Sequence, residues 1–193
     1  HVSNDGILFI AGIEGLMVHD GFNWDLLSVD TQQELLTNRI HSILETTDGH
    51  IYVQDQANHV YYFNNRHKLE VLLNPENGLP LEISNAGIWG GERIYMVEKD
   101  QIFVFRGAML EEELALEGIS EIWDVYKNKG QVLLLTTTGM YTYENGELNP
   151  LKFDNEVINL NTFSRFEVVK EDLRIISSSG SLCYKLKEKQ FCE

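Results

Sequence analysis

Basic residues are scarce in this sequence, which has 15 lysines and arginines against 30 aspartates and glutamates and a formal charge of −15. Binding to a phosphate backbone depends on clustered lysine and arginine side chains, so nucleic acid is not expected as a partner. Surplus acid also keeps a protein soluble, and this is the reading that we favour. A field that attracts cationic or metal-bearing ligands is the alternative.

Long apolar runs are also missing, and prolines are few. No apolar run approaches the roughly 20 residues that a membrane-spanning helix needs, and only three prolines and no Ser/Gly-rich linker interrupt the chain. We therefore expect residues 1–193 to form one domain or a piece of one. The sequence has no starting methionine and no leader, and the strand-like run Ile7 to Ala11 comes almost at once. This predicts a segment of a longer protein, so missing targeting signals say nothing about location.

A pattern with a period near 40 residues recurs along the chain. Apolar runs follow each turn, and their first residues lie 44, 43, 38 and 41 positions apart: Ile7, Ile51, Ile94, Val132 and Leu173. Such a period with four strands per unit is typical of a propeller blade. The predicted fold is an all-β propeller with about five four-stranded antiparallel blades, the first and last incomplete, at residues 7–28, 39–74, 83–116, 119–154 and 157–192.

The first unit lacks its inner strand. Either the final segment supplies that strand and closes a five-bladed ring, or the chain is part of a larger propeller; we favour the larger propeller because the sequence starts inside a blade. The second strands read as continuous apolar runs, as expected for sheets that are covered on both faces. The fourth strands are polar, and we interpret Glu111 to Glu113 as protection of an outer edge rather than as an acidic site.

Residues Leu36 to Ile43 (LTNRIHSI), followed by Asp48 to Val53 (DGHIYV), resemble the two-component regulator propeller repeat. Tyr52 stands where that repeat usually has tryptophan, and Gln54-Asp55 replaces its Gly-Thr. The first unit has a similar pattern, with GILFIAG at 6–12 and GLMVHDG at 15–21. The resemblance therefore spans nearly the whole chain, although its motif is short and degenerate.

The resemblance implies an extracytoplasmic sensor propeller of a membrane-anchored signalling protein, a hybrid histidine kinase or a diguanylate cyclase. On this reading the chain is a non-enzymatic binding module on the periplasmic or extracellular side, linked to a membrane only through the rest of the protein, with a homodimer as one arrangement. A secreted or periplasmic propeller enzyme acting on glycans, lyase or hydrolase, is the alternative, and a non-catalytic interaction scaffold is a third. Fold alone does not decide between them.

Four of the six histidines fall in one unit: His41, His50, His59 and His67. With turns at 46–49 and 55–58, His41 and His59 both lie opposite Gln54 on flanking strands, about 9.6 Å apart. Zinc ligands lie about 2.1 Å from a common ion, so this pair cannot share one. We predict no metal site and no cofactor. The sequence also lacks a Gly-x-Ser-x-Gly elbow and a phosphate-binding glycine loop, and we assign no catalytic residue.

A small-molecule or oligosaccharide ligand is expected at the mouth of the central channel. Hinges between the second and third strands of each unit, and the loops that enter the inner strands, line this mouth in propellers. Trp89 and Trp123 follow Ile88 and Ile122 at matching places in inner strands and could stack on a sugar, although packing between blades is the favoured reading. The candidate ligand-binding residues are Glu14, Asp55, Asn58, Trp89, Asp100, Trp123 and Thr138.

The two cysteines lie near the end of the sequence. A two-residue turn at Lys187-Glu188 places Cys183 directly opposite Cys192 in a hairpin, with Tyr184 facing Phe191. Cross-strand neighbours are close enough to be bridged when the geometry permits. Two states of this pair are consistent with the sequence. One is a disulfide, which would suit an oxidising compartment, and the other is two reduced thiols in the core.

Overall fold

The computed structural model describes residues 1–64, 67–74, 78–81, 83–119, 121–128, 131–144, 147–153, 156–157, 163–169, 172–177 and 180–192. Every regular element among them is a β-strand, which confirms the predicted all-β propeller-type fold. Nowhere in these ranges is there a helix long and apolar enough to cross a membrane. The chain divides into two compact units: His1–Glu98 with Ile102–Leu114, and Lys99–Gln101 with Ala115–Glu193.

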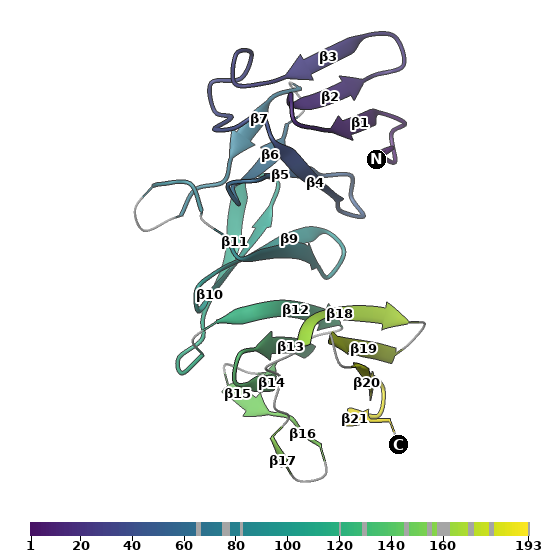
Figure 1. Cartoon of the computed structure of the whole chain (residues 1–193), viewed down its shortest axis with the longest axis vertical. Helices are drawn as coiled ribbons and strands as arrows, with labels where there is room; N and C mark the ends of the chain where they lie inside the picture. The colour runs from purple at the N-terminus through teal and green to yellow at the C-terminus, as the bar shows by residue number, and fades with distance from the viewer. Residues whose placement is uncertain are drawn as a thin grey trace. The chain divides into compact units, whose positions relative to one another are not determined.

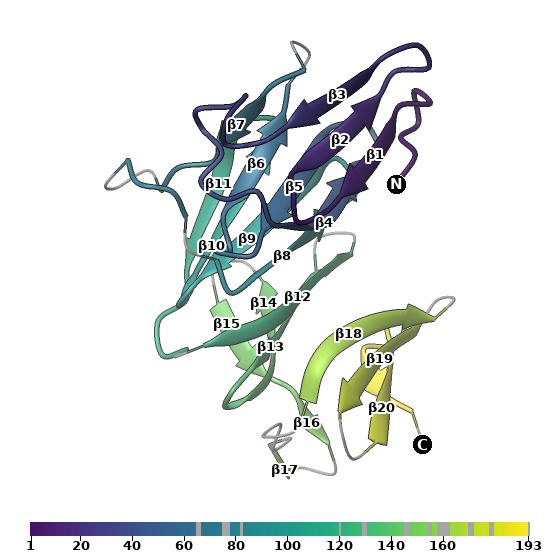
Figure 2. The ribbon, with the colours of Figure 1, turned by 45° about the horizontal axis from the view of Figure 1, so that its top comes forward.

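The first unit carries three antiparallel sheets, one with three strands and two with four (Figure 1 and Figure 2). In sheet order the first sheet has β1 (Leu8–Ala11), β2 (Leu16–His19) and β3 (Trp24–Leu27). The second has β4 (Ile40–Glu45), β5 (Ile51–Asp55), β6 (Val60–Phe63) and β7 (Leu69–Val71). The third has β8 (Asn85–Trp89), β9 (Arg93–Glu98), β10 (Gln101–Arg106) and β11 (Met109–Ala115).

The second unit carries two four-stranded sheets and a short hairpin. The first of these sheets has β12 (Ile122–Asn128), β13 (Gln131–Thr136), β14 (Gly139–Glu144) and β15 (Glu147–Pro150). The hairpin has β16 (Lys152–Phe153) and β17 (Glu156–Val157), so the expected fourth strand over 147–153 is split in two. The other sheet has β18 (Phe163–Val169), β19 (Asp172–Ser177), β20 (Gly180–Lys185) and β21 (Gln190–Phe191), whose outer strand is short as expected.

Alternate residues of β5 pack toward the sheets on its two sides. Ile51 and Val53 of β5 are buried with Phe9 of the first sheet, whereas Tyr52 between them is buried with Ile94 of the third sheet. Successive side chains of a strand point to opposite faces. A strand whose two faces are both covered must therefore be apolar throughout, which explains the continuous apolar runs.

Inner strands of the first unit begin with a hydrogen bond to the hinge of the preceding sheet. The Ile40 N–H donates to the Gly12 carbonyl over 2.9 Å, and the Ile83 N–H donates to the Asn58 carbonyl over 3.2 Å. The turn between β4 and β5 takes residues 46–50, so that Glu45 pairs with Ile51 and Ser42 rather than His41 pairs with Gln54; a β-bulge then lies between Ser42 and Ile40. On the other side Gln54 pairs with Val60, not with His59. The predicted placement of both histidines opposite Gln54 is therefore wrong by one residue, because the turn and the hinge are each one residue longer than expected.

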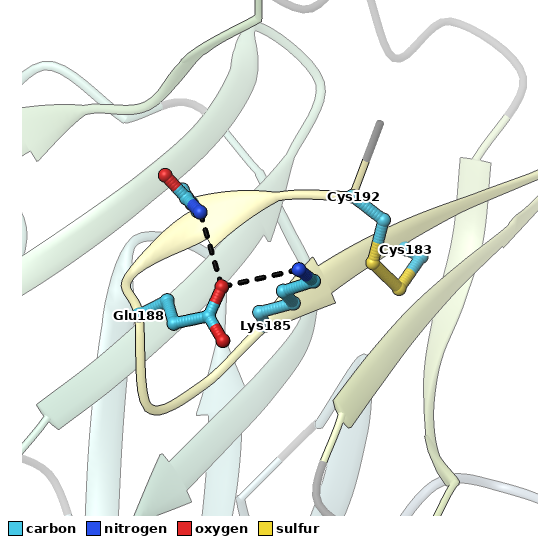
Figure 3. Close-up of a disulfide and its surroundings, with 5 residues drawn as sticks. Cys183, Lys185, Glu188 and Cys192 are labelled. Carbon is cyan, nitrogen blue, oxygen red and sulfur yellow. Dashed lines mark hydrogen bonds and ion pairs between the residues drawn. A yellow bond between two sulfur atoms is a disulfide. The ribbon is translucent and has the colours of Figure 1, made fainter.

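The hairpin of β20 and β21 has the register read from the sequence. Figure 3 shows its disulfide and the contact of Lys185 with Glu188. Tyr184 pairs with Phe191, and the Cys192 N–H donates to the Cys183 carbonyl over 2.9 Å. The structure joins Cys183 to Cys192 as a disulfide, with 5.3 Å between the two Cα atoms. The connecting residues 186–189 are fixed at one point by Lys185, whose ammonium lies 3.1 Å from the Glu188 carboxylate. The disulfide therefore anchors a strand of only two residues to its neighbour.

Candidate functional site

Asp55 closes the hinge between β5 and β6 from inside the protein. Its side chain is fully buried, and Oδ1 accepts hydrogen bonds from the N–H groups of Ala57 (2.8 Å) and His59 (2.9 Å). Oδ2 accepts one from the Tyr61 hydroxyl (2.8 Å) and lies 3.2 Å from His59 Nδ1. A buried carboxylate with this many donors is satisfied where it is. Asp55 therefore builds the hinge and offers nothing to a ligand.

Tyr61 extends this network to the loop that enters β4. Its hydroxyl donates to Asp55 and accepts a hydrogen bond from the Leu36 N–H over 3.1 Å. Burial raises the pKa of Tyr61 above its ordinary value, and the neighbouring Asp55 carboxylate raises it further. Tyr61 therefore stays a neutral donor at physiological pH and ties the entry loop to the hinge.

His59 is a polar residue of this hinge that the sequence reasoning did not select. Its Nδ1 lies 3.2 Å from Asp55 Oδ2, within hydrogen-bonding distance, and the His59 side chain is 15% exposed. The signal in the sequence was the spacing Asp55-x-x-x-His59, because aspartate commonly caps the N–H groups of its own turn.

The remaining predicted residues are divided between the units. Glu14 and Asn58 are exposed in the first unit, in the two hinges to which the inner strands bond, and Asn58 adopts a positive φ of 65°. Asp100 and Thr138 are exposed and belong to the second unit. The Asp100 carbonyl accepts a hydrogen bond from the Leu116 N–H, and the Thr138 hydroxyl lies 3.1 Å from the Tyr141 hydroxyl.

The two tryptophans do not occupy matching places. Trp89 is the last residue of β8 and is 1% exposed, with its ring 6.2 Å from that of Tyr95. Trp123 is the second residue of β12, inside a bulge between Ile122 and Asp124, and packs against the core of the second unit. A buried ring cannot stack on a ligand, so we do not include Trp89 in the candidate site. The Ile-Trp pair thus stands at the end of β8 but at the beginning of β12.

A cleft of about 270 Å³ lies between the first two sheets, at the end of the strands away from the hinges. The rings of Phe9 and Phe63 line it and meet edge to face, 5.1 Å apart. Its polar lining includes Asp5, His50 and His67, of which Asp5 and His67 are exposed. Aromatic rings beside a few polar groups are typical of small-ligand sites. These residues come from three separate stretches of the chain, so no local motif marked them.

Asp48 links the second sheet to the third, beside this cleft. Its Oδ1 accepts a hydrogen bond from Thr46 Oγ1 (2.6 Å) and lies 3.0 Å from His50 Nδ1, and Oδ2 lies 3.0 Å from Arg106 Nη2. Burial alone would raise the pKa of Asp48. Hydrogen bonds from Thr46, His50 and Arg106 outweigh burial and lower the pKa from 3.8 to about 2.

Replacing Asp48 by asparagine is expected to weaken the dependence of stability on acid pH. A carboxylate whose pKa is lower in the folded chain stabilises it fully above the ordinary value of 3.8, and this contribution is lost as the pH falls towards about 2. The variant should therefore be less stable than the parent at pH 6, with the gap closing on acidification. Urea unfolding at several pH values measures this. A gap that is the same at pH 6 and pH 2 would contradict it.

Metal binding has no support within the described ranges, where no three His, Cys, Asp or Glu side chains are grouped closely enough to hold an ion.

No protein-family model matches the sequence, and no curated protein matches it. Solved structures do match. The extracellular domain of BT4673 from B. thetaiotaomicron, described as a hybrid two component system, is 17% identical with a TM-score of 0.66 over 94% of this chain. The likeness shows the fold. PorZ of the Porphyromonas gingivalis type-IX secretion system is 12% identical with a TM-score of 0.70 over 96% of the chain. The chain spans 26% of the length of each of these two proteins.

Enzymes share this fold as well. Virginiamycin B lyase from Staphylococcus aureus is 12% identical, with a TM-score of 0.66 over the whole of this chain and 67% of its own. Propellers are used for binding and for catalysis alike, so similarity to these structures does not decide between a binding module and an enzyme.

Proposed function

We propose that the chain is an extracytoplasmic ligand-sensing module of a membrane-anchored signalling receptor of the two-component type. Two independent observations point to this class. The repeat in the sequence resembles the two-component regulator propeller, and the fold is similar over 94% of the chain to an extracellular domain of BT4673. The agreement between repeat and fold carries the proposal. The output domain would lie elsewhere in the full protein.

The cleft between the first and second sheets is the proposed ligand site. Its lining comes from both sheets: Phe9 and Asp5 on one side, and Phe63, His50 and His67 on the other. A ligand that contacts both sides would change how the two sheets are held together. Asp48 and Thr47 connect the same end of the second sheet to the third, through Arg106 and through a 2.7 Å hydrogen bond to the Gly91 carbonyl. A signal could therefore pass from sheet to sheet.

Calorimetry with a panel of small molecules and oligosaccharides tests this proposal. We expect a member of the panel to bind and His67→Ala to weaken its binding at least tenfold. Asn58→Ala, at the opposite end of the same sheet, should leave affinity unchanged. Binding that is lost in Asn58→Ala and kept in His67→Ala would show that the ligand binds at the hinges and not in the cleft. Turnover of any panel member would contradict the sensor proposal and would favour an enzyme.

A further inference from the structure

The turns that precede β1 and β5 are built in the same way. In each, a hydroxyl oxygen accepts a hydrogen bond of 3.0 Å from the N–H group four residues further along: Ile7 to Ser3, and His50 to Thr46. An aspartate followed by a glycine stands two positions after the hydroxyl residue in both turns: Asp5-Gly6 and Asp48-Gly49. Asp5 of the first turn is therefore the structural counterpart of Asp48 in the second.

The junctions beside these turns correspond as well. In each junction an aromatic residue of one sheet shares a core with two aromatic residues of the next sheet: Phe9 with Tyr61 and Phe63, and Tyr52 with Phe103 and Phe105. The residue after the last of these is Asn64 in the second sheet and Arg106 in the third. Both junctions lie inside the first unit, so Asn64 occupies at one junction the place that Arg106 occupies at the other.

At the junction of the second and third sheets the aspartate binds the arginine. Nε and Nη2 of Arg106 lie 3.2 and 3.0 Å from Oδ2 of Asp48. Hydrogen bonds between two ionised partners are stronger than those between neutral groups. This position of the repeat is therefore one at which a carboxylate meets a cation from the neighbouring sheet.

At the junction of the first and second sheets that cation is missing. Asn64 is uncharged, and its side chain bonds within its own hairpin: Nδ2 donates to the Glu70 carboxylate, and Oδ1 accepts from the Lys68 N–H over 3.1 Å. The exposed Asp5 carboxylate has no hydrogen-bond or ion-pair partner among the residues that the structure describes. The cleft of about 270 Å³ is lined by both Asp5 and Asn64, and so it opens where the pair would otherwise form.

Other polar groups of the cleft are directed elsewhere. His50 Nδ1 lies 3.0 Å from Asp48, and both His50 Nε2 and the Tyr62 hydroxyl lie 3.7 Å from the place of a Cβ atom on Gly107. Gly107 connects β10 to β11, so these polar atoms face the third sheet. No lysine or arginine is among the described residues that line the cleft. The cleft thus offers a ligand an apolar wall, the exposed imidazole of His67 and one unpaired carboxylate.

We propose that this cleft binds a small organic cation with an apolar body. Its amidinium, guanidinium or ammonium group pairs with Asp5 as the Arg106 guanidinium pairs with Asp48, and its body lies against Phe9 and Phe63. The assignment rests on the proposed function, because it concerns the ligand of the same cleft. A formal charge of −15 favours the approach of cations over anions. The ligand thereby completes a contact that the chain makes by itself one sheet further on.

Benzamidine, benzamide and benzoate test the class of ligand, because they share one shape and carry a positive, a zero and a negative charge. Calorimetry is done at about pH 8, above the range in which histidine side chains ordinarily titrate. We expect benzamidine to bind at least about tenfold more tightly than benzamide, since its hydrogen bonds to the carboxylate are charge-assisted. Benzoate should bind more weakly than either. Benzamide that binds as tightly as benzamidine, or benzoate that binds more tightly, would overturn the assignment.

Asp5→Asn should remove the preference, so that benzamidine binds no more tightly than benzamide. Asp30→Asn is the matched control, because it removes one exposed carboxylate from the loop between β3 and β4 and should leave the preference unchanged. Asn64→Arg puts the arginine of the other junction into this one and should block benzamidine. A preference that survives Asp5→Asn would show that Asp5 does not bind the cation.

Salt dependence gives a readout on the parent chain that does not depend on the folding of a variant. Raising sodium chloride from about 50 to about 500 mM should weaken the binding of benzamidine and leave that of benzamide unchanged, because salt screens a partly exposed ion pair. Equal salt dependence of the two compounds would contradict an ion pair with Asp5. Circular dichroism checks that each variant is folded.

His67→Ala separates failure of this assignment from failure of the proposed site. If His67→Ala weakens benzamidine and benzamide alike and the two bind equally, the cleft is the site but its ligand is not a cation. If benzamidine binding is insensitive to both Asp5→Asn and His67→Ala, the compound binds outside the cleft. If none of the three compounds binds, the assignment to an organic cation is wrong, whereas the site is wrong only if His67→Ala weakens no member of the wider panel.

Discussion

Replacing Gly15 by alanine is expected to destabilise the chain by about 4 kcal/mol, since backbone strain and a forced steric contact each cost about 1–3 kcal/mol. Gly15 follows the β1–β2 hinge with a φ of 135°, a conformation that side chains disfavour. A Cβ atom built there would lie 2.2 Å from the Leu27 carbonyl oxygen. That oxygen belongs to the backbone of β3 and cannot move alone. Urea unfolding of the parent and variant measures the loss.

Gly21→Ala is the matched control for this substitution. Gly21 also has a positive φ, 97°, but a Cβ atom there would meet no other atom within 4 Å. The control therefore contains the cost of the backbone conformation without the contact, and we expect it to lose only about 1 kcal/mol. Equal losses at the two positions would mean that the approach of Leu27 to Gly15 contributes nothing.

Replacing Asp55 by alanine is expected to cost about 3–5 kcal/mol, because several buried donors lose their acceptor and each unpaired donor costs about 1–3 kcal/mol. The substitution leaves the Ala57 N–H, the His59 N–H and the Tyr61 hydroxyl without their acceptor. Each of these donors then has to be buried unpaired or reach water. Asp55→Asn, which keeps an acceptor oxygen and the shape of the side chain, should retain part of the stability.

Asp20→Ala serves as the exposed counterpart. Asp20 also caps the N–H groups of its own turn, accepting hydrogen bonds from Phe22 (2.8 Å) and Asn23 (2.7 Å), but it lies at the surface. Water can replace it there, so its removal should be far less damaging. Thermal unfolding of both variants gives the comparison, and losses of similar size would show that burial of the Asp55 network is unimportant.

Features encoded over short distances were predictable from this sequence. The hairpin of Cys183 and Cys192 has the expected register because a short loop fixes it. The apolar runs around Ile51 and Ile94 predicted sheets covered on both faces, which the packing of Tyr52 against Ile94 confirms. These predictions depend on strand periodicity and on nearby turns, both of which are visible in a single sequence.

Features that depend on one inserted residue or on distant segments were not predictable. The turn at 46–50 and the hinge from Asp55 to His59 are each one residue longer than expected, which shifts the register of the paired strand by one position and reverses the face of its residues. The cleft combines Asp5, Gly49 and His67, which are brought together only when the first two sheets pack. The sequence identified Asp55 as a hinge residue, but it did not show that its carboxylate is buried and accepts a hydrogen bond from the Tyr61 hydroxyl.

The outer side of β19 and β20 is expected to tolerate substitution. On these strands the side chains that alternate with the core residues are mostly polar, including Asp172, Arg174 and Lys185. Changes there should therefore affect the stability of the second unit far less than changes at Leu173, Ile175 or Tyr184, which are buried.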